Sequence, residues 1–209
     1  MTTQVRAVGA KSEKAPLESI EITRRDVLPE DVRIAIEYSG ICHSDIHTVR
    51  GEWGDMPYPV VPGHEIIGRV IEVGDKVSKY SVGDLVGVGV IVKSCGECAN
   101  CLAGDEHFCQ GPTGPLLTYA EADPYTQGAS THGGYSREIV TTEKFVYSIP
   151  ENLDKAAAAP LLCAGITVYS PLKHWGAGPG KTVGVVGIGG LGHMAVKFSH
   201  ALGAHTVAL

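Results

Sequence analysis

Short segments rich in β-branched residues, separated by charged or glycine-containing turns, fill the first 150 residues. Apolar runs between turn signals indicate strands, and we predict them at 31–38, 68–74, 84–92 and 137–150. This part of the chain is therefore predicted to be mainly β, folded as a sandwich or an irregular barrel.

The pattern changes after Pro150. Residues 154–175 are predicted to form two helical pieces, the second opening at Pro160. A buried strand, a helix and the start of another strand are expected at 181–190, 191–204 and 205–209. Together they make one βαβ unit, the opening of a doubly wound sheet. Because one such unit cannot cover both faces of its sheet, we expect the 209 residues to be part of a longer protein.

Composition narrows the class of protein. The chain is 44% hydrophobic and 19% charged, as in ordinary soluble domains, and its formal net charge is −6 at pH 7. A negative chain is a poor partner for nucleic acid. The N-terminus lacks the apolar core of a signal peptide, and no apolar run reaches the length of a spanning helix. We therefore expect a cytoplasmic protein with no nucleic-acid or membrane partner.

Four of the six cysteines lie within the stretch SCGECANCLAGDEHFC, with the spacing C-x2-C-x2-C-x7-C. They are Cys95, Cys98, Cys101 and Cys109. Four thiolates this close can surround one Zn²⁺ tetrahedrally and leave no position open for substrate, which is a structural site. Iron–sulfur ligation is the alternative, because similar spacings hold clusters. Disulfides are less expected in a reducing compartment.

The other two cysteines, Cys42 and Cys163, are far apart in sequence. A lone cysteine is usually a small buried hydrophobe. However, His64 and Glu65 stand at a glycine-flanked turn, and two cysteines with one histidine are a recognised ligand set for catalytic zinc. Gly68 stands where an H-E-x-x-H helix would need histidine, so that motif is excluded. From spacing alone, a second zinc and two buried cysteines remain equally good interpretations.

A glycine turn with the pattern G-x-G-x-x-G lies between the predicted strand at 181–190 and the helix after it. The residues assigned to cofactor binding are Gly187, Gly189, Gly190, Leu191 and Gly192. Gly187 would make the tight turn, Gly189 would let a pyrophosphate approach the backbone, and Gly192 would allow close packing of helix on strand. The strand–turn–helix context favours dinucleotide binding over a simple tight turn.

Several stretches together resemble the zinc-dependent medium-chain alcohol dehydrogenases, particularly the cinnamyl-alcohol-dehydrogenase-like aldehyde reductases. They are GICHSDIH, PGHEIIGRVIEVGDKV, SCGECANC, PLLCAGITVYSPLKHW and GPGKTVGVVGIGGLGHMAVK. The resemblance implies an α/β fold with a mainly β, GroES-like catalytic domain at 1–150. That domain would include a structural-zinc lobe at 94–110. The start of an incomplete Rossmann cofactor domain would follow at 151–209.

The resemblance also implies two zinc ions per chain and assigns all six cysteines. The catalytic zinc would be held by Cys42, His64 and Cys163, with Glu65 as a nearby carboxylate that can approach the metal. The structural zinc would be held by Cys95, Cys98, Cys101 and Cys109.

Further roles follow from the same resemblance. Ser44 and His47 match a proton relay, and Asp45 matches the carboxylate that orients the histidine ligand. His43 would lie near the cofactor pyrophosphate, and Thr167 near the nicotinamide. By the same resemblance, Trp53 would line the substrate channel; a packed aromatic on its loop is an equally good interpretation. Without the resemblance, Ser44, Asp45 and Thr167 would be interpreted as ordinary turn and cap residues.

The implied activity is the interconversion of primary alcohols and aldehydes by hydride transfer. NADP(H) is preferred to NAD(H), because the related reductases generally use it. The residue that would decide between them falls at or past Leu209. The full-length form would be a homodimer. A non-catalytic module with one structural zinc is the alternative, and the zinc-free quinone-reductase branch is disfavoured by the cysteine ligands.

Overall fold

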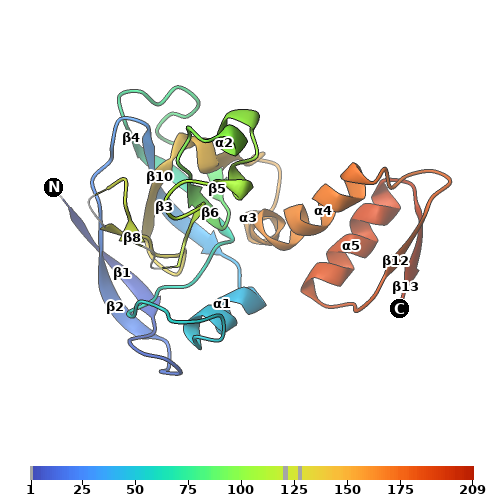
Figure 1. The fold of residues 1–209 in the computed structure, drawn as a ribbon, viewed down its shortest axis with the longest axis horizontal. Coiled ribbons are helices and arrows are strands. Elements are labelled where there is room, and N and C mark those ends of the chain that lie inside the picture. Colours follow the sequence, from blue (N-terminus) through green and yellow to red (C-terminus); the bar gives the residue numbers. More distant parts are fainter. Residues whose placement is uncertain (1, 120–121, 127–128) are drawn as a thin grey trace. The chain divides into compact units, whose positions relative to one another are not determined.

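The computed structural model describes residues 2–119, 122–126 and 129–209. The chain divides into two compact units, Met1–Ala159 and Pro160–Leu209, which are described separately (Figure 1). Among the residues that the structure describes, no helix is both long and apolar enough to cross a membrane.

The first unit is built on a five-stranded sheet in the order β10-β3-β4-β5-β11, with all neighbours antiparallel. Its strands are β3 (Asp31–Ser39), β4 (Ile66–Val73), β5 (Leu85–Val88), β10 (Glu138–Thr142) and β11 (Val146–Ser148). One short 3₁₀ turn, η2 (Glu143–Phe145), joins β10 to β11, which are the two opposite edges. A link that short requires the sheet to curl, and apolar side chains fill its core, among them Val32, Ile34, Ile66, Val86 and Ile139.

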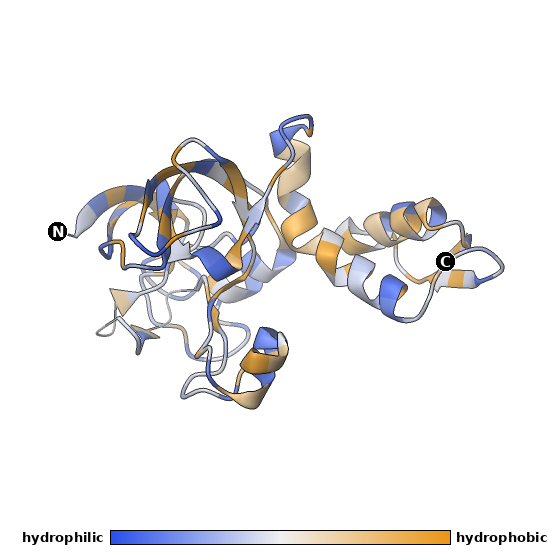
Figure 2. Ribbon diagram, turned by 90° about the horizontal axis from the view of Figure 1, so that it is seen from above, coloured by the Kyte–Doolittle hydropathy of each residue, from blue (hydrophilic) through white to orange (hydrophobic). Residues whose placement is uncertain are grey.

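A hairpin of β1 (Thr3–Gly9) and β2 (Glu18–Arg24) stands beside this sheet. Its residues alternate between buried and exposed, with Val5, Ala7 and Ile22 in a second core around Val61. Figure 2 shows the alternation as bands of colour along the ribbon near the N-terminus. Smaller elements complete the unit: α1 (His43–Val49), β6 (Ile91–Lys93), α2 (Ala99–Ala103), η1 (Glu106–Phe108), β7 (Leu116–Leu117), β8 (Ala122–Asp123), β9 (Ala129–Ser130) and α3 (Lys155–Ala158).

The second unit contains the predicted βαβ arrangement. Strand β12 (Thr182–Val185) pairs in parallel with β13 (His205–Ala208), and α5 (Gly190–Ala201) connects them. A further helix, α4 (Ala164–His174), packs along α5, as Figure 1 shows. Gly203 follows α5 with a φ of +86°, a conformation that favours glycine just past a helix end. The predicted fold class, mainly β and then the start of a doubly wound sheet, is confirmed.

Three predicted boundaries were wrong. The strand expected at 84–92 is two strands, because β5 pairs with β4 whereas β6 leaves that sheet to pair with β7. The strand expected at 137–150 is interrupted by η2, where the chain crosses between the sheet edges. Pro160 does not open the second helix. It lies in the 3₁₀ turn η3 (Ala159–Leu162), and Cys163, whose backbone is not helical, separates that turn from α4.

A buried arginine fixes the loop before β10. Arg24, only 4% exposed, donates from Nη1 to the carbonyl of His132 at 2.8 Å and from Nη2 to the carbonyl of Gly133 at 3.1 Å. A third bond, of 2.8 Å, joins Nη2 to the Ser136 hydroxyl. Burial lowers the pKa of Arg24 to about 9, so the guanidinium is still charged at neutral pH.

The loop that Arg24 fixes in turn holds residues 61–63. Backbone N–H groups of Gly133, Gly134 and Tyr135 donate to the carbonyls of residues 61, 63 and 62 at 2.8, 2.8 and 2.9 Å. A Cβ at Gly133 would lie 2.3 Å from the Pro62 carbonyl oxygen, so only glycine permits this approach. The hydrogen bonds of Arg24 to the loop at 132–136 therefore support the turn that carries His64 and Glu65.

Replacing Arg24 with methionine keeps the bulk of the side chain but removes these charge-assisted hydrogen bonds. We expect Arg24→Met to lower the free energy of unfolding by about 3 kcal/mol, measured by urea titration. The matched control is Arg6→Met, because Arg6 is exposed on β1 and its loss should change that free energy by less than about 0.5 kcal/mol. Equal free energies of unfolding for the two variants would show that the hydrogen bonds of Arg24 do not stabilise the fold.

Candidate metal centres

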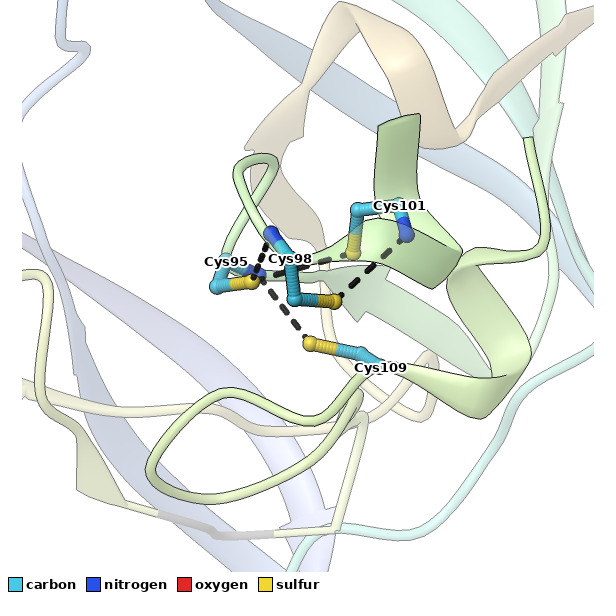
Figure 3. A group of neighbouring side chains, drawn as sticks. All are labelled: Cys95, Cys98, Cys101 and Cys109. Atoms are coloured by element: carbon cyan, nitrogen blue, oxygen red, sulfur yellow. Dashed lines mark hydrogen bonds between the residues drawn. The ribbon is translucent and has the colours of Figure 1, made fainter. Parts of the chain in front are cut away.

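The four clustered cysteines converge in one lobe of the first unit. Cys95 follows β6, Cys98 caps α2, Cys101 lies within that helix, and Cys109 ends η1. Their sulfur atoms lie within 4.8 Å of one another, and Figure 3 shows the four side chains facing a common point. All four are free thiols.

The spacing of the sulfurs fits a tetrahedral metal. Sγ of Cys95 and Sγ of Cys101 are 3.8 Å apart. Zn–S bonds of about 2.3 Å in a tetrahedron separate the sulfurs by about 3.8 Å. A disulfide would need about 2.05 Å, so the sulfurs are spaced as a metal would require and not as a disulfide bridge.

Backbone amides surround these sulfurs and favour thiolates. The N–H groups of Gln110 and Cys101 donate to Sγ of Cys98 at 3.4 and 3.5 Å, and these bonds lower the pKa of Cys98 to about 6. The N–H groups of Cys95 and Gly111 likewise donate to Cys109 and lower its pKa. The pKa of Cys101 is raised to about 11: its strongest contact, with Ser94, lowers it, but burial and the neighbouring thiols of Cys98 and Cys109 outweigh that contact. A cation would therefore displace the remaining protons.

A second group of possible ligands in the first unit is organised by Asp45. Cys42 immediately precedes α1, while His64 and Glu65 immediately precede β4, and the ligand atoms of these three residues lie within 4.8 Å of one another. Asp45 Oδ2 accepts the N–H of Cys42 at 3.0 Å. Asp45 Oδ1 accepts the N–H of Gly63 at 2.8 Å and faces Nδ1 of His64 at 3.0 Å.

Burial makes these contacts strong. His64 is 1% exposed, and Asp45 and Glu65 are each 3% exposed. Because Asp45 accepts a hydrogen bond from Nδ1–H, the proton stays on Nδ1, and Nε2 is the ring nitrogen with a lone pair for a metal. Asp45 was expected to orient a histidine ligand, and it makes the hydrogen bond to His64 that this role requires.

Glu65 is packed against the backbone of Gly40. A Cβ at Gly40 would lie 2.0 Å from Oε2 of Glu65, so no larger residue fits there without displacing the carboxylate. The Gly40 N–H also donates to the Glu65 carbonyl at 2.9 Å. Gly40 therefore allows a buried carboxylate to reach the same space as Cys42 and His64.

Helix α1 carries the residues assigned to the proton relay and the cofactor. Ser44 and His47 are three positions apart and so share one helix face, whereas His43 is exposed at the first position of the helix. Nδ1 of His47 pairs with the Glu52 carboxylate, and this hydrogen bond lowers the pKa of Glu52. The indole of Trp53 lies 5.1 Å from the His47 ring, between centroids. Glu52, three residues past the end of α1, was not among the predicted site residues, because nothing in its sequence spacing marks it.

The second unit holds the remaining predicted residues. Cys163 is the N-cap of α4, and its carbonyl accepts the N–H of Thr167, an exposed residue of that helix. In the glycine turn, Gly187 has a φ of +81°, Gly189 caps α5 and Gly190 begins it, with Leu191 in its first turn. A Cβ at Gly192 would lie 1.9 Å from the Gly187 carbonyl oxygen. The close packing predicted for this turn is therefore present.

Comparison with protein families gives one domain match: the alcohol dehydrogenase GroES-like domain matches residues 28–151. Among curated proteins, the chain is 58% identical over 206 residues to "Aldehyde reductase YahK" of Escherichia coli, covering 98% of this chain and 58% of that protein. It is also 58% identical over 205 residues to "NADP-dependent alcohol dehydrogenase C 1" of Mycolicibacterium smegmatis, with the same coverage. The chain thus spans little more than half the length of these relatives.

Solved structures with a similar fold include cinnamyl alcohol dehydrogenases. A cinnamyl alcohol dehydrogenase of Sorghum bicolor superposes with a TM-score of 0.94 at 43% identity, covering 99% of this chain and 58% of that one. The enzyme CAD of Helicobacter pylori, complexed with NADP(H), superposes with a TM-score of 0.95 at 44% identity, covering 100% of this chain and 59% of that one.

The cysteine lobe gives a direct test of metal binding. Replacing the buried Cys101 with serine removes one thiolate ligand, and we expect the zinc content to fall by about one atom per chain because an incomplete set of ligands binds weakly. Elemental analysis measures the content, and limited proteolysis should cut within 94–110 faster than in the wild type. The control is Leu102→Ala. Leu102 is an exposed neighbour on α2, so this change should alter neither the zinc content nor the rate of proteolysis. An unchanged zinc content in Cys101→Ser would refute the lobe as a metal site.

Proposed function

Because this chain belongs to the alcohol dehydrogenase GroES-like family, we propose that its protein is a zinc-dependent oxidoreductase that interconverts primary alcohols and aldehydes with NADP(H). Residues 1–150 would form the catalytic domain, with the zinc lobe at 94–110, and residues 151–209 would begin the cofactor domain. The observation that carries the proposal is the pair of possible metal ligands, the half-buried Cys42 and the buried His64, that Asp45 orients through hydrogen bonds.

The catalytic zinc would be held by Cys42, His64 and Cys163. Thiolate, imidazole and carboxylate are the donors that zinc takes in proteins, and two cysteines with one histidine leave one position open. With Cys163 as the third ligand, every cysteine outside the four-cysteine lobe has a role. Glu65, buried beside Cys42 and His64, supplies a carboxylate that can approach the metal. Zinc bound there would act as a Lewis acid that polarises the substrate carbonyl or lowers the pKa of the alcohol.

The lobe of Cys95, Cys98, Cys101 and Cys109 would hold the structural zinc. Four thiolates fill all four positions of a tetrahedral site, so substrate has no place to bind there. Support comes from the sulfur separation of 3.8 Å and from the backbone amides that favour thiolates.

Protons would move along α1. The Glu52 carboxylate would accept a hydrogen bond from Nδ1–H of His47, which leaves Nε2 to accept or donate a proton. Ser44, on the same face of α1, would pass the proton between the substrate oxygen and His47, and His47 is partly exposed to solvent. The role of Glu52 is to hold the His47 ring in the tautomer that a relay needs.

The glycine turn of the second unit would bind the cofactor pyrophosphate. The Gly187 and Gly192 backbones approach closely, and the N-terminus of α5 presents its amide groups beyond Gly189. His43 and Thr167 would contact the pyrophosphate and the nicotinamide. A nicotinamide bound there supplies the hydride acceptor or donor. NADP(H) is favoured because the relative from M. smegmatis is NADP-dependent and the H. pylori structure contains NADP(H).

The substrate would be a small alcohol or aldehyde, in keeping with the names of the relatives. Trp53, 61% exposed and stacked near His47, would form one wall of the substrate channel. The full-length protein would be a homodimer. A cytoplasmic location stays a prediction.

Metal content tests the two sites together. We expect the wild type to bind two zinc ions and to keep one after dialysis against a mild chelator, because the open site exchanges faster than the closed one. The variant Cys163→Ala should bind one zinc from the outset, measured by elemental analysis, whereas Ile166→Ala, an exposed change on the same helix, should bind two. A wild type that never binds more than one zinc would favour the alternative of a non-catalytic module with a structural zinc.

The relay is tested by steady-state kinetics on the full-length protein, with NADPH and an aromatic aldehyde. We expect His47→Gln to lower kcat about 100-fold with little change in KM, since it removes a proton carrier and leaves substrate binding intact. Glu52→Gln should cause a smaller loss of kcat because His47 is retained but less well held. The control is Glu21→Gln on the exposed face of β2. If Glu52→Gln behaves as Glu21→Gln does, Glu52 has no part in the relay.

A further inference from the structure

A tyrosine hydroxyl meets the proposed ligand His64 at the same ring nitrogen as Asp45. Oη of Tyr119 lies 2.5 Å from Nδ1 of His64, and the two rings meet edge to face, with centroids 5.5 Å apart and planes at 73°. Tyr119 is 5% exposed, so this contact is shielded from water. It comes from a part of the chain 55 residues beyond His64 and unrelated to α1.

The backbone just before Tyr119 is held by a strand pairing and two further hydrogen bonds. Just before it, β7 pairs with β6, and the N–H of Thr118 donates to the carbonyl of Val90 at 3.1 Å. The hydroxyl of Thr131 donates to the carbonyl of Leu117 at 2.7 Å. A tyrosine on such a segment can place its hydroxyl with little freedom, which a positioning group requires.

Asp45 alone leaves the His64 ring incompletely fixed. Its Oδ1 atom is shared between the Gly63 N–H, at 2.8 Å, and Nδ1 of His64, at the longer distance of 3.0 Å. A single hydrogen bond at Nδ1 still permits small rotations of the ring about its Cβ–Cγ bond. A second partner at Nδ1, reaching it from the segment after β7 and not from α1, removes much of this freedom. Because all three side chains are buried, the contacts are stronger than they would be in water.

We propose that Tyr119 is a second positioning residue for His64, sharing the Nδ1–H proton with Asp45 and aiming Nε2 at the catalytic metal. The inference rests on the proposed function, in which His64 is a zinc ligand. Tyr119 touches neither substrate nor cofactor in this role; it acts only through the imidazole. Partners of this kind typically change metal affinity by about 10- to 100-fold.

The test replaces Tyr119 with phenylalanine, which keeps the ring and removes the hydroxyl. Zinc affinity is measured by competition with a chromogenic chelator, and the metal geometry by the visible absorption of the Co²⁺-loaded protein. We expect Tyr119→Phe to weaken one of the two sites about 10- to 100-fold, to leave the other unchanged and to alter the cobalt bands of the weakened site. The control is Tyr80→Phe, which removes a half-buried hydroxyl that donates to the Val146 carbonyl at 2.6 Å and not to any of the proposed metal ligands.

The outcomes separate the inference from the function beneath it. Two sites of unchanged affinity in Tyr119→Phe would overturn the role of Tyr119 and leave the proposed function standing. Equal weakening of both sites would also overturn it, since that indicates general loosening. A wild type with only one site would overturn both proposals.

A measurement on the wild type covers the case in which Tyr119→Phe does not fold. The zinc-loaded protein, with ¹⁵N-labelled histidine, should show the Nδ1–H proton of His64 in NMR spectra, protected from exchange and with a nuclear Overhauser effect to the Tyr119 ring. A His64 Nδ1–H proton that exchanges freely, or that shows no contact with Tyr119, would overturn the inference.

Discussion

The Asp45 carboxylate joins the two chain segments that carry the possible metal ligands of the first unit. One of its oxygens binds the backbone beside Cys42, and the other binds the backbone and side chain at residues 63 and 64. A buried carboxylate is costly unless donors surround it, and here three donors do so. The same contacts that stabilise Asp45 therefore bring a thiol and an imidazole together. Neutralising or shortening this side chain would separate the ligands and leave the buried donors without partners.

The turn that Asp45 contacts is held in place by hydrogen bonds from more distant segments. The 61–63 turn is held by the N–H groups of residues 133–135, and their loop is held by the buried Arg24. Arg24 ends β2, so the hairpin at the start of the chain helps to fix a turn some forty residues later. Glycine at residue 133 is required because its backbone meets that of Pro62. The geometry of the site thus depends on residues that touch no ligand.

The sequence predicted the local chemistry well and the long-range contacts poorly. The spacing of four cysteines indicated one metal site, because a short loop must bring them together, and the glycine turn was recognisable between a strand and a helix. The strand at 84–92 was misjudged because a change of sheet partner leaves no mark in an apolar run. Tyr119 and Arg24 were missed for a similar reason. Their partners are 55 and 108 or more positions away, and a lone tyrosine or arginine has no pattern that identifies a partner.

The two groups of possible metal ligands in the first unit differ in how their side chains are held in place. The cysteine lobe has only a five-residue helix and a 3₁₀ turn as regular structure, and its sulfurs are held by amide bonds that favour thiolates. Thiolates this close repel one another, so the zinc proposed for the lobe would contribute to its folding. Cys42 and His64, by contrast, are placed by Asp45 through hydrogen bonds that exist without metal. Under the proposed function, a site prepared in this way would lose little conformational entropy when it binds a metal, and it would release and rebind that metal without unfolding.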